Sequence, residues 1–349
     1  MKQESFLEEK RKQAFSIFEK GALPSFRHGL TMNLQVGTLN FLGQEKSILD
    51  GDAVLAGKYL FTLIPPLDKL SAYHCAHATI KVVHVQKGEE KTIVLERQDA
   101  SFHLLVVAEE KSRVILVDTV VESASDLTTS GTEIILADGA ELSLLTLKRS
   151  GNRVFSSCAI HAGKDVSINI IEAVLGGSLH QSKTEVRLVG EGSSFDYQGI
   201  FFGIRDEQVE LSTKVVHAAE RTSSRLLMLG AVGGKAKGIV IPEIHIEANA
   251  KDARGHEEAN LLILEETANA NAIPLLVIDN PDVSCGHAAR IGHLNADALF
   301  YMMSRGLDEA KAKRLIIEGF FTPITDSIDQ AKIKQEVVSL IQKRLVDVL

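Results

Sequence analysis

Short apolar runs that alternate with polar residues dominate the chain from about residue 47 to residue 293. Examples are 103–109 (HLLVVAE), 141–149 (ELSLLTLKR) and 238–248 (GIVIPEIHIEA), and we expect the first of the series at 54–64 (VLAGKYLFTLI). Gly, Asp, Asn or Ser separates most of these runs. Many short strands at near-regular spacing, with no helical pattern between them, predict an all-β body.

The alternation within one run predicts which side chains face solvent. Glu243, His245 and Glu247 share one parity, and Ile244 and Ile246 share the other. Because successive side chains of a strand point to opposite faces, the first set is expected outside and the second inside. A polar stripe of this kind is what any half-covered strand shows, so it is not by itself evidence of a functional site.

The number of strands decides between two β architectures. A sandwich with this many strands is unusually large for one domain, whereas a solenoid can be any length because each rung rests on the previous one. The sequence has no strict hexapeptide or other fixed repeat. A parallel β-helix is therefore the preferred prediction, and a sandwich stays open as the alternative.

Helical patterns flank the β-rich region on both sides. An amphipathic helix is expected near the N-terminus, ending at Gly21 and Pro24. Near the C-terminus, Asn295 is placed to cap a helix that stops at Gly306, and Asp308 to cap the next one. A last amphipathic helix carries one apolar stripe, formed by Ile333, Val337, Leu340, Ile341, Leu345 and Val348. The predicted division is an N-terminal helical segment at 1–46, a β-helix core at 47–293 and a C-terminal helical domain at 294–349.

Composition narrows the classes of protein. The 349 residues carry a net charge of −8, with no dense basic run, which argues against nucleic-acid binding because that rests on Lys and Arg at the phosphates. The N-terminus has no apolar signal segment, and no apolar run is long enough to span a membrane. Three widely spaced cysteines do not suggest a disulfide framework, so a cytoplasmic protein is expected.

Several enzyme motifs are approached but not completed. The segment 230–236 (GAVGGKA) lacks the glycine spacing and the Ser or Thr of a phosphate loop. The segment 256–260 (HEEAN) ends in Asn where a zinc protease helix needs His. The segment 73–77 (YHCAH) matches no standard zinc spacing and is expected to be an exposed polar loop. A large β body without such a motif favours a scaffold or binding protein over an enzyme.

One short segment, 282–287 (DVSCGH), concentrates metal-binding chemistry. If it is extended, Val283, Cys285 and His287 point to one face. Thiolate and imidazole suit zinc or iron–sulfur chemistry, but two ligands cannot complete a tetrahedral site, so a second chain or further residues must supply the rest. From the pattern alone, the default interpretation is a buried free cysteine beside a packed histidine.

The segment 282–321 resembles the C-terminal signature of the SufB/SufD family, whose members are scaffold subunits of the SUF machinery for iron–sulfur cluster assembly. The resemblance rests on Asp282-Val283, Cys285-Gly286-His287, Gly292, Leu299-Phe300-Tyr301, Ser304-Arg305-Gly306 and Asp308-Glu309-Ala310. It is specific from Gly238 onward and weakest at the N-terminus. SufB-type chains carry a cysteine shortly before the proline of the last strand, whereas 267–273 here reads TANANAI. The Cys-Gly-His triplet is therefore similar to the SufD pattern.

The resemblance implies a fold, partners and site residues. The family fold is a right-handed parallel β-helix flanked by helices, and the chain is expected to be a non-catalytic scaffold. His287, with Cys285, is implied as a ligand of iron or of a transient iron–sulfur cluster shared with a SufB-like partner, and a reduced flavin is possible in the complex. A SufC-type ATPase is expected to dock on the C-terminal helices, at positions that correspond here to Phe300, Tyr301, Arg305 and Gly306.

Three alternatives accompany this expectation. The chain could form a homodimer in the absence of a SufB-like partner. It could be a β-solenoid adaptor with no metal role, whose tail docks a partner. A carbohydrate-active β-helix enzyme is the third possibility, but an aromatic content of 5% without tryptophan speaks against sugar binding.

Overall fold

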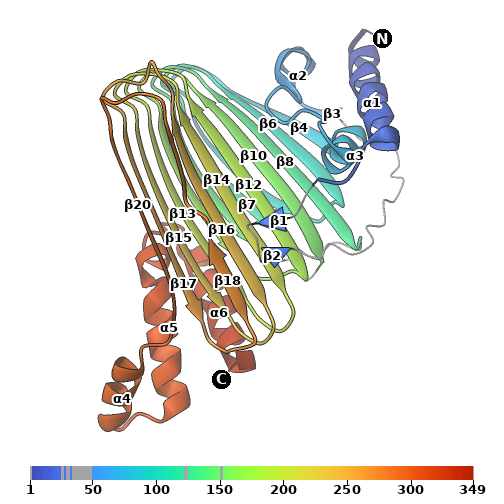
Figure 1. The fold of residues 1–349 in the computed structure, drawn as a ribbon. Helices are drawn as coiled ribbons and strands as arrows, with labels where there is room; N and C mark the ends of the chain where they lie inside the picture. The colour runs from blue at the N-terminus through green and yellow to red at the C-terminus, as the bar shows by residue number, and fades with distance from the viewer. Residues whose placement is uncertain are drawn as a thin grey trace.

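The computed structural model describes residues 2–24, 27–28, 32–33, 49–121, 125–149 and 152–348. Its body is a parallel β-solenoid in which two long sheets face each other, with helices at both ends (Figure 1). The predicted solenoid is thus confirmed, and the sandwich alternative is wrong. The expected boundary between residues 46 and 47 lies outside the described residues.

Two parallel sheets make up the solenoid, and we call them sheet I and sheet II. Sheet I has the spatial order β18 (Asn269–Ala272), β16 (Lys237–Ile246), β14 (Gln208–His217), β12 (Leu179–Leu188), β10 (Arg153–Ala162), β8 (Leu127–Leu136), β6 (Ser101–Ala108), β4 (Thr79–Val85) and β3 (Leu49–Asp50), and β19 (Leu275–Ile278) also pairs with β16. Sheet II has the order β20 (Ser284–His293), β17 (Arg254–Ile263), β15 (Ser223–Val232), β13 (Ser194–Gly203), β11 (Ser167–Val174), β9 (Glu141–Lys148), β7 (Arg113–Val120) and β5 (Glu90–Arg97). A small antiparallel pair, β1 (Arg27–His28) and β2 (Met32–Asn33), stands apart.

The helices lie at the two ends of the chain. Those at the N-terminal end are α1 (Lys2–Lys20), α2 (Ala53–Tyr59) and α3 (Lys69–His77). Those at the C-terminal end are α4 (Ala296–Ser304), α5 (Glu309–Thr325) and α6 (Ala331–Val348). No described helix is long and apolar enough to cross a membrane.

The rungs of the solenoid are hydrogen-bonded at their corners as well as along their strands. At seven corners from sheet I to sheet II, one residue has a positive φ, and its N–H donates to a carbonyl of the next corner over 2.7 to 3.2 Å. These donors are Gly88, Lys111, Gly139, Asp165, Gly192, Arg221 and Asp252. The left-handed conformation turns the chain sharply, so that each corner can stack on the following one.

Apolar side chains fill most of the space between the sheets, but a polar seam crosses it. We give this name to Arg97, Asp118, Lys148, Glu172 and Tyr197, all on the inner face of sheet II. Arg97 Nε lies 2.6 Å from Asp118 Oδ1, and Lys148 forms an ion pair with Glu172. The Tyr197 hydroxyl donates to Glu172 over 2.7 Å. Although burial alone raises the pKa of Glu172, the Lys148 charge and these hydrogen bonds lower it overall.

Helices α5 and α6 cover part of the outer face of sheet II. Phe321 packs against Phe202, with ring centroids 6.0 Å apart. The Arg344 guanidinium donates to both carboxylate oxygens of Glu207, over 2.6 and 3.1 Å. The predicted caps Asn295 and Asp308 are confirmed, because each side chain accepts a hydrogen bond from a backbone N–H in the first turn of its helix.

Two expectations for the N-terminal region are wrong. The run 54–64 does not start the strands: α2 occupies Ala53–Tyr59, capped by the side chain of Asp52. The segment 73–77 is not an exposed loop, because it forms the end of α3, where Tyr73, His74 and Cys75 are buried. Its residues pack the N-terminal helices against sheet I.

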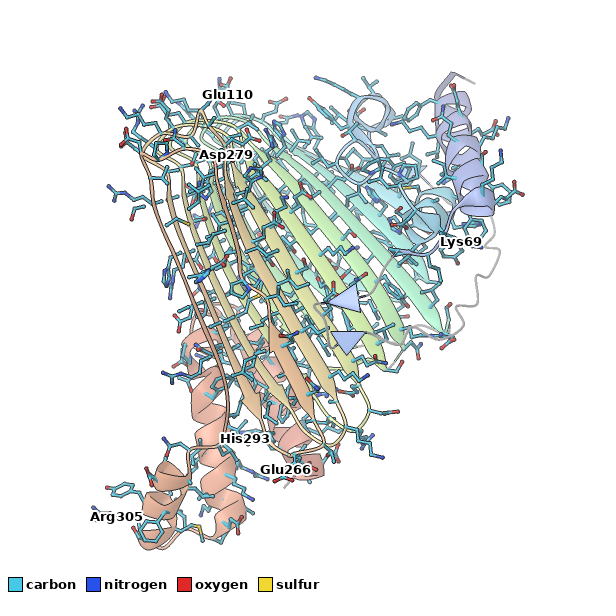
Figure 2. The ribbon with its side chains drawn as sticks, viewed as in Figure 1. Lys69, Glu110, Glu266, Asp279, His293 and Arg305 are labelled. Carbon is cyan, nitrogen blue, oxygen red and sulfur yellow. The ribbon has the colours of Figure 1, made fainter. Side chains whose placement is uncertain are left out.

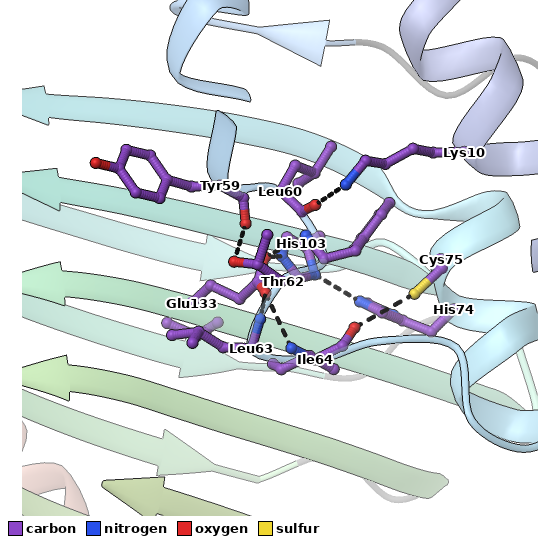
Figure 3. Close-up of polar contacts among 12 residues, drawn as sticks. Lys10, Tyr59, Leu60, Thr62, Leu63, Ile64, His74, Cys75, His103 and Glu133 are labelled. Atoms are coloured by element: carbon purple, nitrogen blue, oxygen red, sulfur yellow. Dashed lines mark hydrogen bonds and ion pairs between the residues drawn. The ribbon is translucent and has the colours of Figure 1, made fainter. Parts of the chain in front are cut away.

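A buried carboxylate holds this N-terminal region against sheet I through hydrogen bonds (Figure 3). Glu133 accepts hydrogen bonds from the backbone N–H groups of Phe61, Leu63 and Ile64 over 2.6 to 2.9 Å. Its other neighbour is His103, whose Nε2 lies 3.0 Å away and whose Nδ1 lies 3.0 Å from His74 Nε2. Burial by itself raises the pKa of Glu133, but His103 and the backbone donors outweigh it and lower the pKa.

The two ends of sheet II differ in character. At the N-terminal end, the edge strand β5 exposes Glu90, Thr92 and Glu96, together with one apolar side chain, Val94. Charged residues on an edge strand discourage pairing with another chain. The C-terminal end, formed by β20, carries few such charges and is described below.

Replacing Glu133 by Ala is expected to weaken the attachment of residues 61–64 to sheet I. One buried and two partly buried N–H groups would lose their acceptor, and a fully buried group left unsatisfied costs about 1 to 3 kcal/mol. Amide hydrogen exchange at Phe61, Leu63 and Ile64 should then accelerate strongly in Glu133→Ala. Glu185→Ala, at an exposed position of β12, is the matched control. Unchanged protection in Glu133→Ala would contradict the proposed role of Glu133 in holding residues 61–64.

Breaking the ion pair of the polar seam should destabilise the solenoid more than removing the whole pair. Lys148→Met leaves Glu172 buried without its cation, at a cost of about 3 to 5 kcal/mol, whereas Lys148→Met/Glu172→Leu should recover most of the loss. Urea unfolding measures both. The partly exposed pair Lys214–Glu243 is the control, because Lys214→Met should cost less than about 1 kcal/mol.

Candidate metal-ligand site at the end of the solenoid

The last rung of the solenoid is only half covered. Strand β20 pairs with β17 on one side, and no described strand pairs with its other edge. Four large apolar side chains of this rung are 41 to 44% exposed, namely Leu275, Val277, Ile278 and Ile291. In Figure 1, β20 runs along the side of the solenoid opposite the N-terminal helices. A free strand edge with apolar neighbours can accept a strand from another chain.

Cys285 and His287 project from the inner face of this last strand. The predicted extended conformation is confirmed, since β20 runs in register with β17 and pairs Cys285 with Gly255 and His287 with Glu257. Gly255 leaves room for the thiol, because a Cβ at that position would lie 3.1 Å from Cys285 Sγ. Cys285 packs against the core, whereas the His287 side chain is 49% exposed.

Glu257 lies directly beneath His287 and was not expected from the sequence analysis. Its side chain is fully buried, and its Oε1 is 3.7 Å from His287 Nδ1. Burial, and secondarily the charge of Glu243, raises the pKa of Glu257 to about 8. The N–H of Leu275 is near enough to oppose this shift, but its geometry falls short of a hydrogen bond, so neither carboxylate oxygen has a hydrogen-bond partner among the described residues. The sequence carried one signal that Glu257 is buried: the alternation in 254–263 (RGHEEANLLI) places Glu257 on the same face of the strand as Gly255.

The donor set suits a transition metal but is incomplete. Burial, followed by the nearby Glu257, raises the pKa of the Cys285 thiol, so metal binding must displace its proton. Alternate residues of one strand point to the same face, so Cys285 and His287 can supply at most two of the four ligands of a tetrahedral site. Across the described residues, no three or more His, Cys, Asp and Glu side chains are grouped so that they could hold a metal ion. The chain therefore offers individual ligands at an open edge rather than a closed site.

The four residues expected to dock a partner lie apart from this edge, in and just after α4. Helix α4 extends beyond the solenoid body and contacts α5, as Figure 1 shows. Phe300 is 75% exposed and Tyr301 57% exposed. Arg305 covers the Tyr301 ring at 5.1 Å and donates to its hydroxyl over 3.1 Å, and Figure 2 shows it at the far end of the tail. Gly306 has a φ of +92°, which fits the predicted helix stop.

Comparisons with known proteins agree with this architecture. The family model described as SUF system FeS cluster assembly, SufBD core domain, matches residues 92–320. The iron-sulfur cluster assembly protein SufD of Bacillus subtilis is 26% identical over 292 residues, which cover 79% of this chain and 67% of that protein. An iron-sulfur cluster assembly SufBD family protein of Mycobacterium tuberculosis is 27% identical over 253 residues, covering 70% of this chain and 63% of the relative.

A further relative from Staphylococcus epidermidis, also named as an iron-sulfur cluster assembly SufBD family protein, is 27% identical over 231 residues and is covered over 49% of its length. The chain thus spans between about half and two thirds of the curated relatives that it matches. Since the family model covers most of the solenoid and extends into α5, the chain belongs to the SufBD core domain family of the SUF system for iron–sulfur cluster assembly, and within it the chain is most like SufD.

Proposed function

We propose that this chain is a non-catalytic, SufD-like scaffold subunit that pairs with a SufB-like subunit in the cytoplasm. The proposal rests on one observation: Cys285 and His287 stand on a half-covered last rung, and no described strand pairs with its outer edge. A strand of the partner added to β20 would cover the exposed apolar side chains. It would also bring further ligands next to the imidazole, which the incomplete donor set requires.

In this proposal the iron or iron–sulfur cluster is cargo rather than a resident cofactor. His287, with Cys285, holds it transiently while the partner supplies the remaining ligands. A closed tetrahedral site of four protein ligands is typical of structural metal centres, whereas an open, shared site suits a species that has to leave. A reduced flavin in the complex stays a prediction.

The C-terminal tail supplies the second proposed interface. A SufC-type ATPase docks on α4 through Phe300 and Tyr301, and Arg305 and Gly306 shape the end of the helix. Exposed aromatic side chains on a projecting helix suit this role, because aromatic residues and Arg dominate the energetics of protein interfaces. Movement of the ATPase would then be transmitted through α5 and α6, which pack on sheet II, to the rungs near the cargo site.

Replacing His287 by Ala should lower cluster assembly while the complex still forms. The side chain is half exposed, so its loss leaves the fold intact. The measurement is iron–sulfur absorbance after anaerobic reconstitution with iron and sulfide, in the complex with the SufB-like and SufC-type partners. His256→Ala, on the exposed face of β17, is the matched control. Assembly at the normal rate in His287→Ala would remove the ligand role and favour a plain adaptor.

Phe300→Ser and Tyr301→Ser should each weaken binding of the SufC-type ATPase. Loss of a central aromatic contact costs about 2 kcal/mol or more, which is roughly a thirtyfold rise in Kd. Titration calorimetry on the purified chain measures this. Val346→Ser, which changes an equally exposed apolar residue on α6, should leave the Kd unchanged. Equal effects of all three changes would argue against docking on α4.

A further inference from the structure

The carboxylate of Glu257 differs from the other buried carboxylates of the fold in its lack of hydrogen-bond partners among the described residues. The other acidic side chains buried in the solenoid have partners: Glu133 accepts three backbone N–H groups, Glu172 has Lys148, Asp118 has Arg97, and Glu210 accepts from Gln181. Glu257 is just as buried, yet among the described residues no hydrogen bond reaches either of its oxygens. A buried polar group without a hydrogen bond destabilises a fold.

Packing alone does not require an acid at this position. Each residue of the inner column of sheet II stacks on its counterpart in the next rung, and the column reads Leu144, Ile170, Tyr197, Leu226, Glu257 and His287. Leu226 is fully buried one rung before Glu257, so an apolar side chain fits the column. The carboxylate therefore serves something other than packing, and His287 is the only Lys, Arg or His side chain within 4 Å of it among the described residues.

We propose that Glu257 is a positioning residue for His287. The inference rests on the proposed role of His287 in holding the cargo metal. Nδ1 is the ring nitrogen that faces Glu257, at 3.7 Å from Oε1, and a small rotation of either side chain closes this gap to a hydrogen bond in which Nδ1–H donates to Oε1. The carboxyl group can accept this bond in both of its protonation states, because a protonated carboxyl keeps a carbonyl oxygen. With the proton held on Nδ1, the lone pair lies on Nε2, at the other side of the ring, where it can bind metal.

Carboxylate–histidine pairs act in this way in many metal sites. The carboxylate fixes both the tautomer and the ring orientation of the ligand, and removing it typically lowers metal affinity about 10- to 100-fold. Glu257 lies behind the imidazole, in the solenoid, while the open edge of β20 lies in front of it.

The test uses the full chain and Co²⁺ alone as the probe. Titration of Co²⁺, followed by its absorbance, gives the affinity for wild type, Glu257→Leu, Glu257→Gln and His287→Ala. Long-range ¹H–¹⁵N spectra of ¹⁵N-histidine protein give the tautomer of His287, assigned by its loss in His287→Ala. Glu258→Gln is the matched control, because Glu258 is the next residue on β17 and faces outward.

Wild type should show the Nδ1–H tautomer, and Glu257→Leu should lose it and bind Co²⁺ at least about tenfold more weakly. Glu257→Gln, whose amide oxygen can still accept the N–H, should fall between the two. Glu258→Gln should stay within twofold of wild type. The midpoint of thermal unfolding should rise in Glu257→Leu, because an unpartnered buried acid is replaced by a side chain that suits the column.

The outcomes separate this inference from the proposed function. If His287→Ala lowers Co²⁺ affinity but Glu257→Leu leaves the affinity or the tautomer as in wild type, the positioning role is overturned and the ligand role stands. If Glu257→Leu weakens both the fold and Co²⁺ binding, Glu257 acts through packing, which also overturns the inference. If His287→Ala binds Co²⁺ as wild type does, the proposed function itself fails.

Discussion

Every rung of this solenoid has to match the rung on which it rests. Parallel strands pair residue by residue, and the corners add their own hydrogen bonds, so each inner position becomes a column that runs the length of the body. A side chain is acceptable only if it fits the members of the column before and after it. The constraint is released at one place, the last rung, because no described strand pairs with the outer edge of β20. The proposed chemistry lies at this place, and the polar ligands there need not satisfy a further rung.

Much of the fold follows from local patterns in the sequence. Glu243 and His245 alternate with the fully buried Ile244 and Ile246, as strand geometry requires. Asn295 caps its helix because its short side chain reaches a free N–H of the first turn. Such features depend on neighbours within a few residues, and they are therefore visible in one sequence.

The errors arose where tertiary contacts outweigh local pattern. The run 54–64 is apolar enough for either a strand or a helix, and the cap at Asp52 was the signal that favoured a helix. Strand β10 is hard to recognise from the sequence, because its inner face carries Ser156 and Cys158, which interrupt the apolar alternation. Those polar residues make sense only beside the polar seam, since Ser156 accepts a hydrogen bond from Lys148 on the facing sheet. The sequence pointed to Cys285 and His287 of the candidate site. It could not single out Glu257, because Glu257 comes next to His287 only through strand pairing between residues thirty positions apart.

The contrast between the two ends of sheet II limits how copies of this molecule can associate. A filament grows when the front of one copy fits the back of the next. Here the back, β5, is fringed with carboxylates such as Glu90 and Glu96, while the front, β20, is flanked by aliphatic side chains such as Ile291. The β5 end and the β20 end are thus not complementary, whereas the apolar β20 ends of two similar chains can pack together. If chains pair as proposed, through their β20 ends, growth stops after a single joint, and a protein made of stackable units remains a discrete particle instead of becoming a fibre.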